Sequence, residues 1–383
     1  MTMPTRPSTS SVSPAPDAHR VERLLSFLES DPGNLNLLAD AAVAAFDARR
    51  FALCDELLDR HAAQAPLPAA LVNLRGLAAL SQHRFDAALR ALEPLLATHD
   101  DPSIRYNAAY ANAMLGRFDE VAGLLDDATL SGEPRAVPLK LRVLHHLGRL
   151  DDAIALGRRH ADSRAASPEL YGALATVLFD AADLDGARHC AERSADTVDG
   201  MTVRGLLALD AGSIDDARDL LQHALAFNPD SARATLGIGL VELAERRLAE
   251  ATDALDRAAD ALKTHAGAWV AAAWAHLFNG DPGAARIRFE RAAELDRGFA
   301  DAYGGLAVLC VHEGRFDEAR RNVAVARRLD ASCLSAALAE SLLATHAGDA
   351  RTAEEIRRAA LDRPLGPGGR TLAQALATAT RGA

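Results

Sequence analysis

The sequence predicts an all-α protein, built as a solenoid of stacked helix-turn-helix repeats with a helical cap at each end. Three observations predict this fold. Of the 383 residues, 49% are hydrophobic but only 4% are aromatic, which suits closely packed helices better than a β-sandwich or barrel. Residues 314–319 read GRFDEA, and near-copies stand at 116–121 (GRFDEV) and 148–153 (GRLDDA). Extending the alignment of these phrases in both directions gives a repeat close to 34 residues long.

The position of each repeat is set by the residue two places after the glycine of the phrase, here called the register residue. Ten register residues fall into step: Phe51, Phe85, Phe118, Leu150, Leu184, Ile214, Leu248, Pro282, Phe316 and Ala350. The nine intervals between them are 34, 33, 32, 34, 30, 34, 34, 34 and 34 residues. Self-similarity at a fixed period of this size is the signature of a solenoid or array.

Four segments follow one another along the chain. Residues 1–16 are rich in Ser, Thr and Pro and are predicted to be disordered. Residues 17–33 are predicted to form an N-terminal capping helix, with Val21, Leu24, Leu25 and Leu28 on its apolar stripe. About ten repeats occupy residues 34–363. Residues 364–383 are predicted to be a C-terminal capping helix or tail, with a short helix over residues 371–380, because terminal repeats need a polar outer face.

Each repeat has the pattern of two helices joined by a tight turn. In the ninth repeat, Tyr303, Leu306 and Cys310 share one stripe of a first helix, and a second stripe begins at Phe316. Gly314 between the stripes can adopt a positive φ, which ends the first helix at small steric cost. Small residues recur nine places before the register residue and alanine recurs three places after it. Small residues facing each other allow the two helices to approach closely.

These residues resemble the tetratricopeptide repeat, in which an aromatic of helix A is followed four positions later by a small residue, and G-x-(Y/F)-x-x-A opens helix B. The match is best in the eighth and ninth repeats, through Trp269, Ala273, Gly280, Ala285, Ala292, Tyr303, Leu306, Ala307, Gly314, Phe316, Ala319 and Ala326. The resemblance covers nearly the whole chain and implies a right-handed α-solenoid. Pro138, Leu141 and Gly157 depart from the pattern, as does the 30-residue interval after Leu184. We therefore expect irregular geometry somewhere in residues 134–200.

Several classes of function are disfavoured by the sequence. A formal charge of −11 argues against nucleic acid as a partner. The four cysteines lie far apart and the doublet at residues 145–146 points in two directions on a helix, so we expect no metal site. No catalytic or cofactor-binding motif occurs, and we expect no cofactor and no enzyme activity. The chain has no apolar run long enough to span a membrane and no secretory signal. We expect a cytoplasmic protein, and its Ala- and Arg-rich, Lys-poor composition is typical of bacteria.

The family resemblance implies that helix A lines a concave surface, through positions one, five and eight after the helix A aromatic. The candidate residues of the binding groove are Tyr106, Tyr110, Arg142, His145, Leu206, Leu240, Trp274, Leu277, Val308, Val311 and Leu342. The same register also includes Leu338. The late repeats are mainly apolar and repeats three and four are more polar, which suits a partner with an apolar anchor and a polar or acidic flank. The alternative is that the apolar residues are buried against neighbouring repeats.

The expected function is a non-catalytic scaffold or adaptor that binds a peptide or helix of a partner protein in the concave groove. Alternatives are a regulatory receptor that senses a ligand or peptide, and a substrate-recruiting subunit of an enzyme complex. Some relatives hold acidic chaperone tails with a cluster of Lys and Asn, but Ala39, Val43 and Leu74 stand at those places here. A chaperone-tail partner is therefore disfavoured. The sequence does not predict the oligomeric state.

Overall fold

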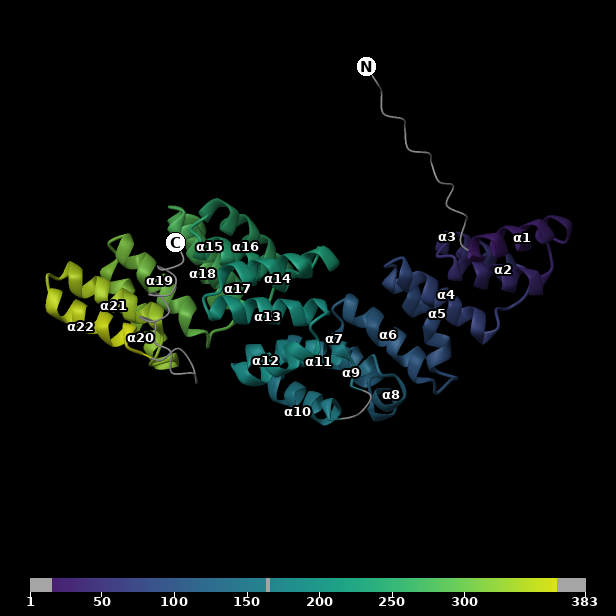
Figure 1. Cartoon of the computed structure of the whole chain (residues 1–383), viewed down its shortest axis with the longest axis horizontal. Coiled ribbons are helices and arrows are strands. Elements are labelled where there is room, and N and C mark those ends of the chain that lie inside the picture. The colour runs from purple at the N-terminus through teal and green to yellow at the C-terminus, as the bar shows by residue number, and fades with distance from the viewer. Residues whose placement is uncertain (1–15, 163–165, 364–383) are drawn as a thin grey trace, which may run out of the picture. The chain divides into compact units, whose positions relative to one another are not determined.

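The computed structural model describes residues 16–162 and 166–363, and all the regular elements in these ranges are α-helices (Figure 1). The first helix of each repeat, helix A, is α2 (Leu35–Asp47), α4 (Ala69–Ser81), α6 (Pro102–Met114), α9 (Ala136–His146), α11 (Pro168–Asp180), α13 (Val198–Asp210), α15 (Ala232–Ala244), α17 (Ala266–Phe278), α19 (Ala300–His312) and α21 (Leu334–His346). The second helix, helix B, is α3 (Phe51–Ala62), α5 (Phe85–Leu96), α7 (Phe118–Leu124), α10 (Leu150–Ala161), α12 (Leu184–Arg193), α14 (Ile214–Phe227), α16 (Leu248–Leu262), α18 (Pro282–Leu295), α20 (Phe316–Leu329) and α22 (Ala350–Leu361). Two further helices, α1 (Pro16–Ser30) and α8 (Asp127–Gly132), stand outside this alternation. In the described ranges, no helix is both long and apolar enough to cross a membrane.

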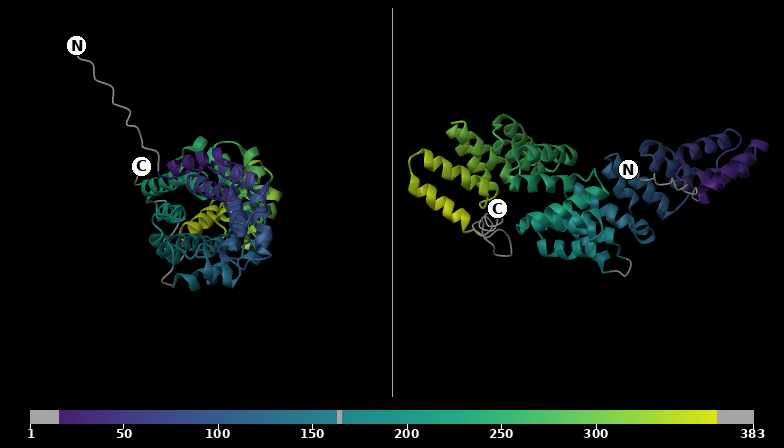
Figure 2. Two further views of the ribbon diagram at one scale, coloured as in Figure 1. Left: turned by 90° about the vertical axis from the view of Figure 1, so that its right-hand side faces the viewer. Right: turned by 45° about the horizontal axis from the view of Figure 1, so that its top comes forward.

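The helices form two compact units, Met1–Ala165 and Ala166–Ala383. Unit 1 contains α1 to α10 and unit 2 contains α11 to α22. Within each unit, helix A packs against helix B of its own repeat and against the helices of the next repeat, as in the row from α13 to α22 (Figure 2). The all-α prediction and the count of about ten repeats are confirmed.

The turn between helix A and helix B is the same in all ten repeats. Every register residue is the first residue of a B helix. The residue two places before it has a positive φ in each case. Six of these residues are glycine, and the other four are Arg49, His83, Ala182 and Arg246. At the ninth turn, the Arg315 N–H donates to the Cys310 carbonyl at 2.8 Å and the Gly314 N–H to the Val311 carbonyl at 3.1 Å. This left-handed cap satisfies carbonyls that the end of helix A leaves unpaired.

The seam between helix A and helix B is built from small residues, as the sequence predicts. The residue three places after the register residue is fully buried in all ten repeats, from Cys54 to Ala353. A Cβ added to Gly76 would lie 2.6 Å from Leu92, and one added to Gly239 would lie 2.6 Å from Leu255. These distances are shorter than a carbon–carbon contact, so the leucine of helix B occupies the space that glycine leaves.

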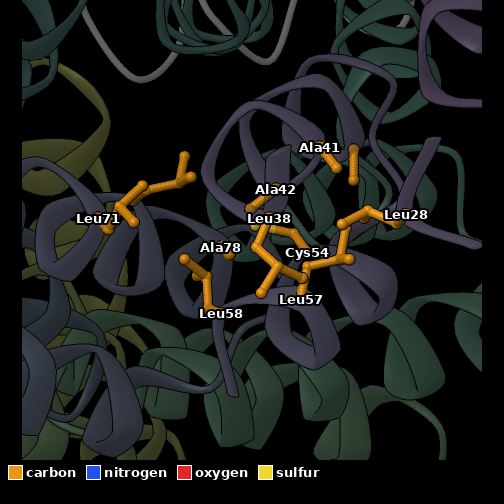
Figure 3. Close-up of a cluster of buried hydrophobic side chains, with 11 residues drawn as sticks. Leu28, Leu38, Ala41, Ala42, Cys54, Leu57, Leu58, Leu71 and Ala78 are labelled. Carbon is orange, nitrogen blue, oxygen red and sulfur yellow. The ribbon is translucent and has the colours of Figure 1, made fainter. Parts of the chain in front are cut away.

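The N-terminal helix α1 covers the first repeat. Its apolar stripe contributes Leu28 to a buried cluster with Leu38 of α2 and Leu57 of α3, and Leu24 and Leu25 pack against the same cluster (Figure 3). Val21 is also fully buried. Residues 1–15, at the N-terminus, and the predicted helix at 371–380 lie outside the described residues.

Irregular geometry begins earlier than the sequence predicts, at the end of the third repeat. Helix α7 has only 7 residues and the separate helix α8 follows it. The Asp126 carboxylate accepts a hydrogen bond from the Thr129 N–H at 2.8 Å, while the Thr129 hydroxyl donates to the Leu124 carbonyl at 3.0 Å. Asp126 therefore caps α8, as an N-cap carboxylate does.

The short interval between Leu184 and Ile214 has a simple cause. Helix α12 has 10 residues whereas α14 has 14, a difference of about one helical turn. The chain then enters α13 at once, and a Cβ added to Gly200 would lie 2.0 Å from the Ser194 carbonyl oxygen. Glycine at this position permits the close approach of the two helix ends.

Candidate functional site

Large apolar side chains are accessible on one pocket of unit 2, here called the α17–α21 pocket. It has a volume of about 440 Å³. Its lining residues are Trp274 and Phe278 of α17, Leu334, Ser335, Ala337 and Leu338 of α21, and Arg357, Ala360 and Leu361 of α22. Phe278 is 58% exposed and Leu338 is 42% exposed. The lining is therefore mainly apolar and open to a partner.

The aromatic wall of the pocket is held in place by packing. Trp274 and Phe278 are one helical turn apart, and their rings stack with centroids 5.6 Å apart. The other side of Trp274 meets Phe289 of α18 at 5.4 Å, with the rings nearly perpendicular. Trp269 lies on the same helix, but its indole N–H donates to the Lys263 carbonyl at 3.1 Å. Trp274 thus combines a packing role with exposure to the pocket.

The predicted apolar residues of unit 2 divide between the core and the surface. Leu206 and Val308 are buried. Leu240, Trp274, Leu277, Val311 and Leu342 are half-buried. Trp274, Leu277 and Leu342 all pack against a core cluster that contains Val308. Self-burial, the alternative interpretation, therefore applies to part of the predicted set, and Trp274 is the member that also lines the α17–α21 pocket.

Phe278 is a pocket residue that the family register misses. The register selects positions one, five and eight after Trp269, and Phe278 stands at position nine. The missed signal is its place one helical turn after Trp274, because residues four apart share a helix face. Leu338 belongs to the register, and Leu334 lies one turn before it on the same face.

A second, more polar surface lies in unit 1. Tyr106 and Tyr110 of α6 stack with ring centroids 6.4 Å apart. The Arg135 guanidinium lies 4.5 Å above the Tyr106 ring, and the Glu133 carboxylate accepts two hydrogen bonds from it at 2.9 Å. Burial raises the pKa of Tyr106, and the positive charges of Arg135 and Arg142 oppose that shift.

The structure therefore brings three of the four predicted residues of unit 1 together. Tyr106, Tyr110 and Arg142 are near one another, with Arg142 exposed on α9. His145 lies on the same helix and is half-buried. A cationic group beside two phenol rings is suited to contact with a polar or acidic segment.

The cysteine thiols are not placed for chemistry. Cys54, Cys190, Cys310 and Cys333 are all free and buried. Burial raises the pKa of Cys54 and of Cys310 to about 11, so both stay protonated at neutral pH and are poor nucleophiles. Across residues 16–162 and 166–363, no three His, Cys, Asp or Glu side chains gather in a way that would hold a metal ion.

Repeated helix pairs with an accessible face on helix A define a class of repeat proteins. Family models described as tetratricopeptide repeat match residues 73–138, 202–266 and 276–345, together just over half of the chain. The chain belongs to the tetratricopeptide repeat family. The longest gap between the matches, residues 139–201, contains the shortened helix α12.

Solved structures show the same fold. The chain is similar to one in a crystal structure of the APC/C hetero-tetramer Cut9–Hcn1, with a TM-score of 0.53, 14% identity, and coverage of 94% of this chain and 76% of that one. A structure of pilF from Pseudomonas aeruginosa has a TM-score of 0.40 and 19% identity, and the match covers 51% of this chain and 90% of that one. No curated protein is similar enough in sequence to count as a relative.

Proposed function

We propose that this protein is a non-catalytic adaptor that binds a helix or peptide of a partner protein at the α17–α21 pocket. Tetratricopeptide repeats are generally protein–protein interaction scaffolds. The observation that carries the proposal is the exposure of Phe278 and Leu338 on opposite sides of one apolar pocket. Fixed aromatic and aliphatic side chains around a concave site are typical of binding surfaces.

The chemistry of the pocket indicates the kind of segment it binds. Its polar side chains are Ser335 and Arg357, and the Arg357 guanidinium already donates to the Glu354 carboxylate at 2.9 Å. The main attraction is therefore burial of an apolar anchor, such as Leu, Met or Phe of the partner. Anchors that fill well-packed pockets contribute about 2 kcal/mol or more to binding.

The tyrosine surface of unit 1 supports a second, weaker contact with the same partner. Tyr106, Tyr110 and Arg142 offer ring faces and a positive charge, which suit the polar or acidic flank of an extended segment. We propose that this surface adds specificity, because charged groups at a solvated rim affect selectivity more than affinity.

The pocket test compares two kinds of exposed apolar residue. Phe278→Ala and Leu338→Ala remove pocket side chains and are expected to reduce partner recovery at least about tenfold in quantitative affinity purification, as hot-spot residues do. Ile287→Ala is the matched control, since Ile287 of α18 is 65% exposed and does not line the pocket. Recovery of the same partners at equal levels by all three variants would contradict the proposal.

Trp274→Ala should also abolish partner binding, but it serves less well as a first test. Its removal takes away the contact with Phe289, which is fully buried. The expected loss of binding would then be mixed with a loss of stability. Circular dichroism and hydrogen exchange on α18 separate the two effects.

We place the protein in the cytoplasm of a bacterium. The four cysteines are free and buried, which suits a reducing compartment. The acidic balance of the chain supports a protein partner rather than nucleic acid. Cell fractionation with a tagged chain tests the compartment.

A further inference from the structure

The last B helix, α22, is packed less completely than the B helices before it. The alanine ten places after the register residue is fully buried in repeats six to nine, at Ala224, Ala258, Ala292 and Ala326. The equivalent residue of α22, Ala360, is only half-buried and lines the α17–α21 pocket. In the earlier repeats, the next A helix packs on this part of helix B, as α21 does on α20 (Figures 1 and 2).

The 34-residue period continues beyond the described residues. Residues 338–346 of α21 read LAESLLATH, and residues 372–380 read LAQALATAT. A shift of 34 places Leu372 on Leu338, Ala373 on Ala339 and Leu376 on Leu342. Ala375 then takes the small-residue position that packs against helix B. This segment therefore carries the pattern of an eleventh A helix.

The contact that such a helix would make can be derived from the preceding repeat. Gly304 of α19 lies against the start of α21, where an added Cβ would be 2.6 Å from the Ser335 side chain and 2.9 Å from the Ala336 backbone. Shifting both sides by 34 residues pairs Leu338 with Gly369. The large residue of α21 thus meets a glycine, whereas in the preceding repeat a glycine meets a larger residue.

We propose that residues 371–380 form an eleventh A helix that packs on α21 and α22 of its own chain and occupies the α22 side of the α17–α21 pocket. Residues 364–370, which read PLGPGGR, span at most about 25 Å when extended, and they start beside Leu361 of the pocket. A ten-residue helix is marginal alone in water, so it depends on packing against Leu338 and Ala360. A partner that uses Leu338 must displace it, and this competition rests on the proposed function.

The test is a disulfide cross-link in the full-length chain. Leu338→Cys with Gly369→Cys places two thiols at the predicted contact, within the range of about 3.5–4.5 Å between Cβ atoms that a disulfide needs. Under mild oxidation the disulfide is expected to form within single chains, at least about tenfold faster than in the control pair. That control is Phe227→Cys with Gly369→Cys, because Phe227 is also an exposed apolar residue, 74% accessible, at the end of α14.

Two further measurements decide the outcome. Adding Leu372→Asp and Leu376→Asp to the Leu338→Cys, Gly369→Cys chain removes the apolar stripe and is expected to slow cross-linking to the control rate. Equal rates in all pairs would overturn the proposal, and so would a disulfide that joins two chains, because a second copy would then supply the helix. Failure to find any partner protein leaves the cross-link unchanged, so the two proposals fail separately.

Discussion

Repeats six to ten and repeats three to five contain the same turn but differ in the lengths of their helices. From Ile214 to Ala350 the register residues are 34 apart, and helices α14 to α20 of helix B type have 14 or 15 residues. In repeats three and five, α7 has 7 residues and α12 has 10. The positive φ before each B helix is nevertheless present throughout. Changes in chain length are thus accommodated at the end of helix B, whereas the turn stays fixed.

The fourth repeat also exchanges large and small residues across its seam. Leu141 stands at the small-residue position and is fully buried. Seven places after the register residue, where other repeats have Leu92, Leu221 or Leu255, the fourth has Gly157. The register therefore indicates that the bulk has moved from helix B to helix A.

The largest expected effect tests this exchange. Leu141→Ala empties a fully buried site and is expected to cost about 3 kcal/mol. If Gly157 faces Leu141, adding Gly157→Leu should return more than half of that loss, because the space is filled from the other helix. Hydrogen exchange of the α9 and α10 amides measures the local stability, which a single melting temperature of a repeat array does not.

The reciprocal control transfers the exchange to a regular repeat. Ala307 and Val323 belong to one buried cluster. Ala307→Leu alone is expected to cost about 1–3 kcal/mol through overpacking, and Val323→Gly should relieve part of it. If Gly157→Leu instead adds to the damage of Leu141→Ala, the two residues do not share a seam.

The comparison also explains what the sequence predicts well. The register residues mark the starts of all ten B helices because the turn depends on local chemistry, a cap with positive φ followed by a bulky residue. Arg49, His83, Ala182 and Arg246 take this conformation without being glycine, so the glycine phrase alone would miss four turns. The fixed period supplies them.

The binding surface is harder to predict, for a physical reason. Leu206 and Leu338 occupy the same register position, yet the first is 6% exposed and the second 42%. Their burial depends on which helices pack over them, and this is set by the stacking of whole repeats. Helix α8 escapes prediction because its signal, the capping residue Asp126, is confined to a few residues.

The next expected effect asks whether the turn is equally favourable in the two kinds of repeat. Gly314 has a φ of 75°, and a Cβ added there meets nothing within 4 Å. Gly314→Ala should therefore cost about 1 kcal/mol from backbone strain alone. Ala182 has a φ of 59° at the equivalent turn, so Ala182→Gly should stabilise the fifth repeat by up to about 1 kcal/mol.

Local hydrogen exchange at the two turns provides the measurement. Opposite signs for the two variants are the expected result. Destabilisation by Ala182→Gly would mean that the entropy of the unfolded chain outweighs the strain at φ of 59°, and the turn would then be set by the period rather than by its residues.

The smallest expected effect concerns the charges that join neighbouring repeats. Arg218 of α14 donates to the Glu242 carboxylate of α15 at 2.9 Å, and Arg247 donates to the same carboxylate. Burial opposes ionisation of Glu242, but these hydrogen bonds outweigh it and hold its pKa below the ordinary value of 4.5. In unit 1, Arg149 and Asp152 form an exposed pair, with side chains 55% and 57% accessible.

The sign of the pH dependence follows from the direction of this shift. A carboxyl group whose pKa is lowered by folding stabilises the protein above its unfolded pKa, and the contribution is lost as the pH falls through the folded pKa. Glu242→Gln should therefore weaken the packing of α14 on α15 at pH 7, and its difference from the unchanged protein should shrink once the pH falls below about 4.5. Asp152→Asn should change little at any pH, since exposed pairs contribute at most about 1 kcal/mol. Hydrogen exchange of α14 and α10 across this pH range distinguishes them, and a constant Glu242→Gln effect would assign the role of Glu242 to its shape rather than its charge.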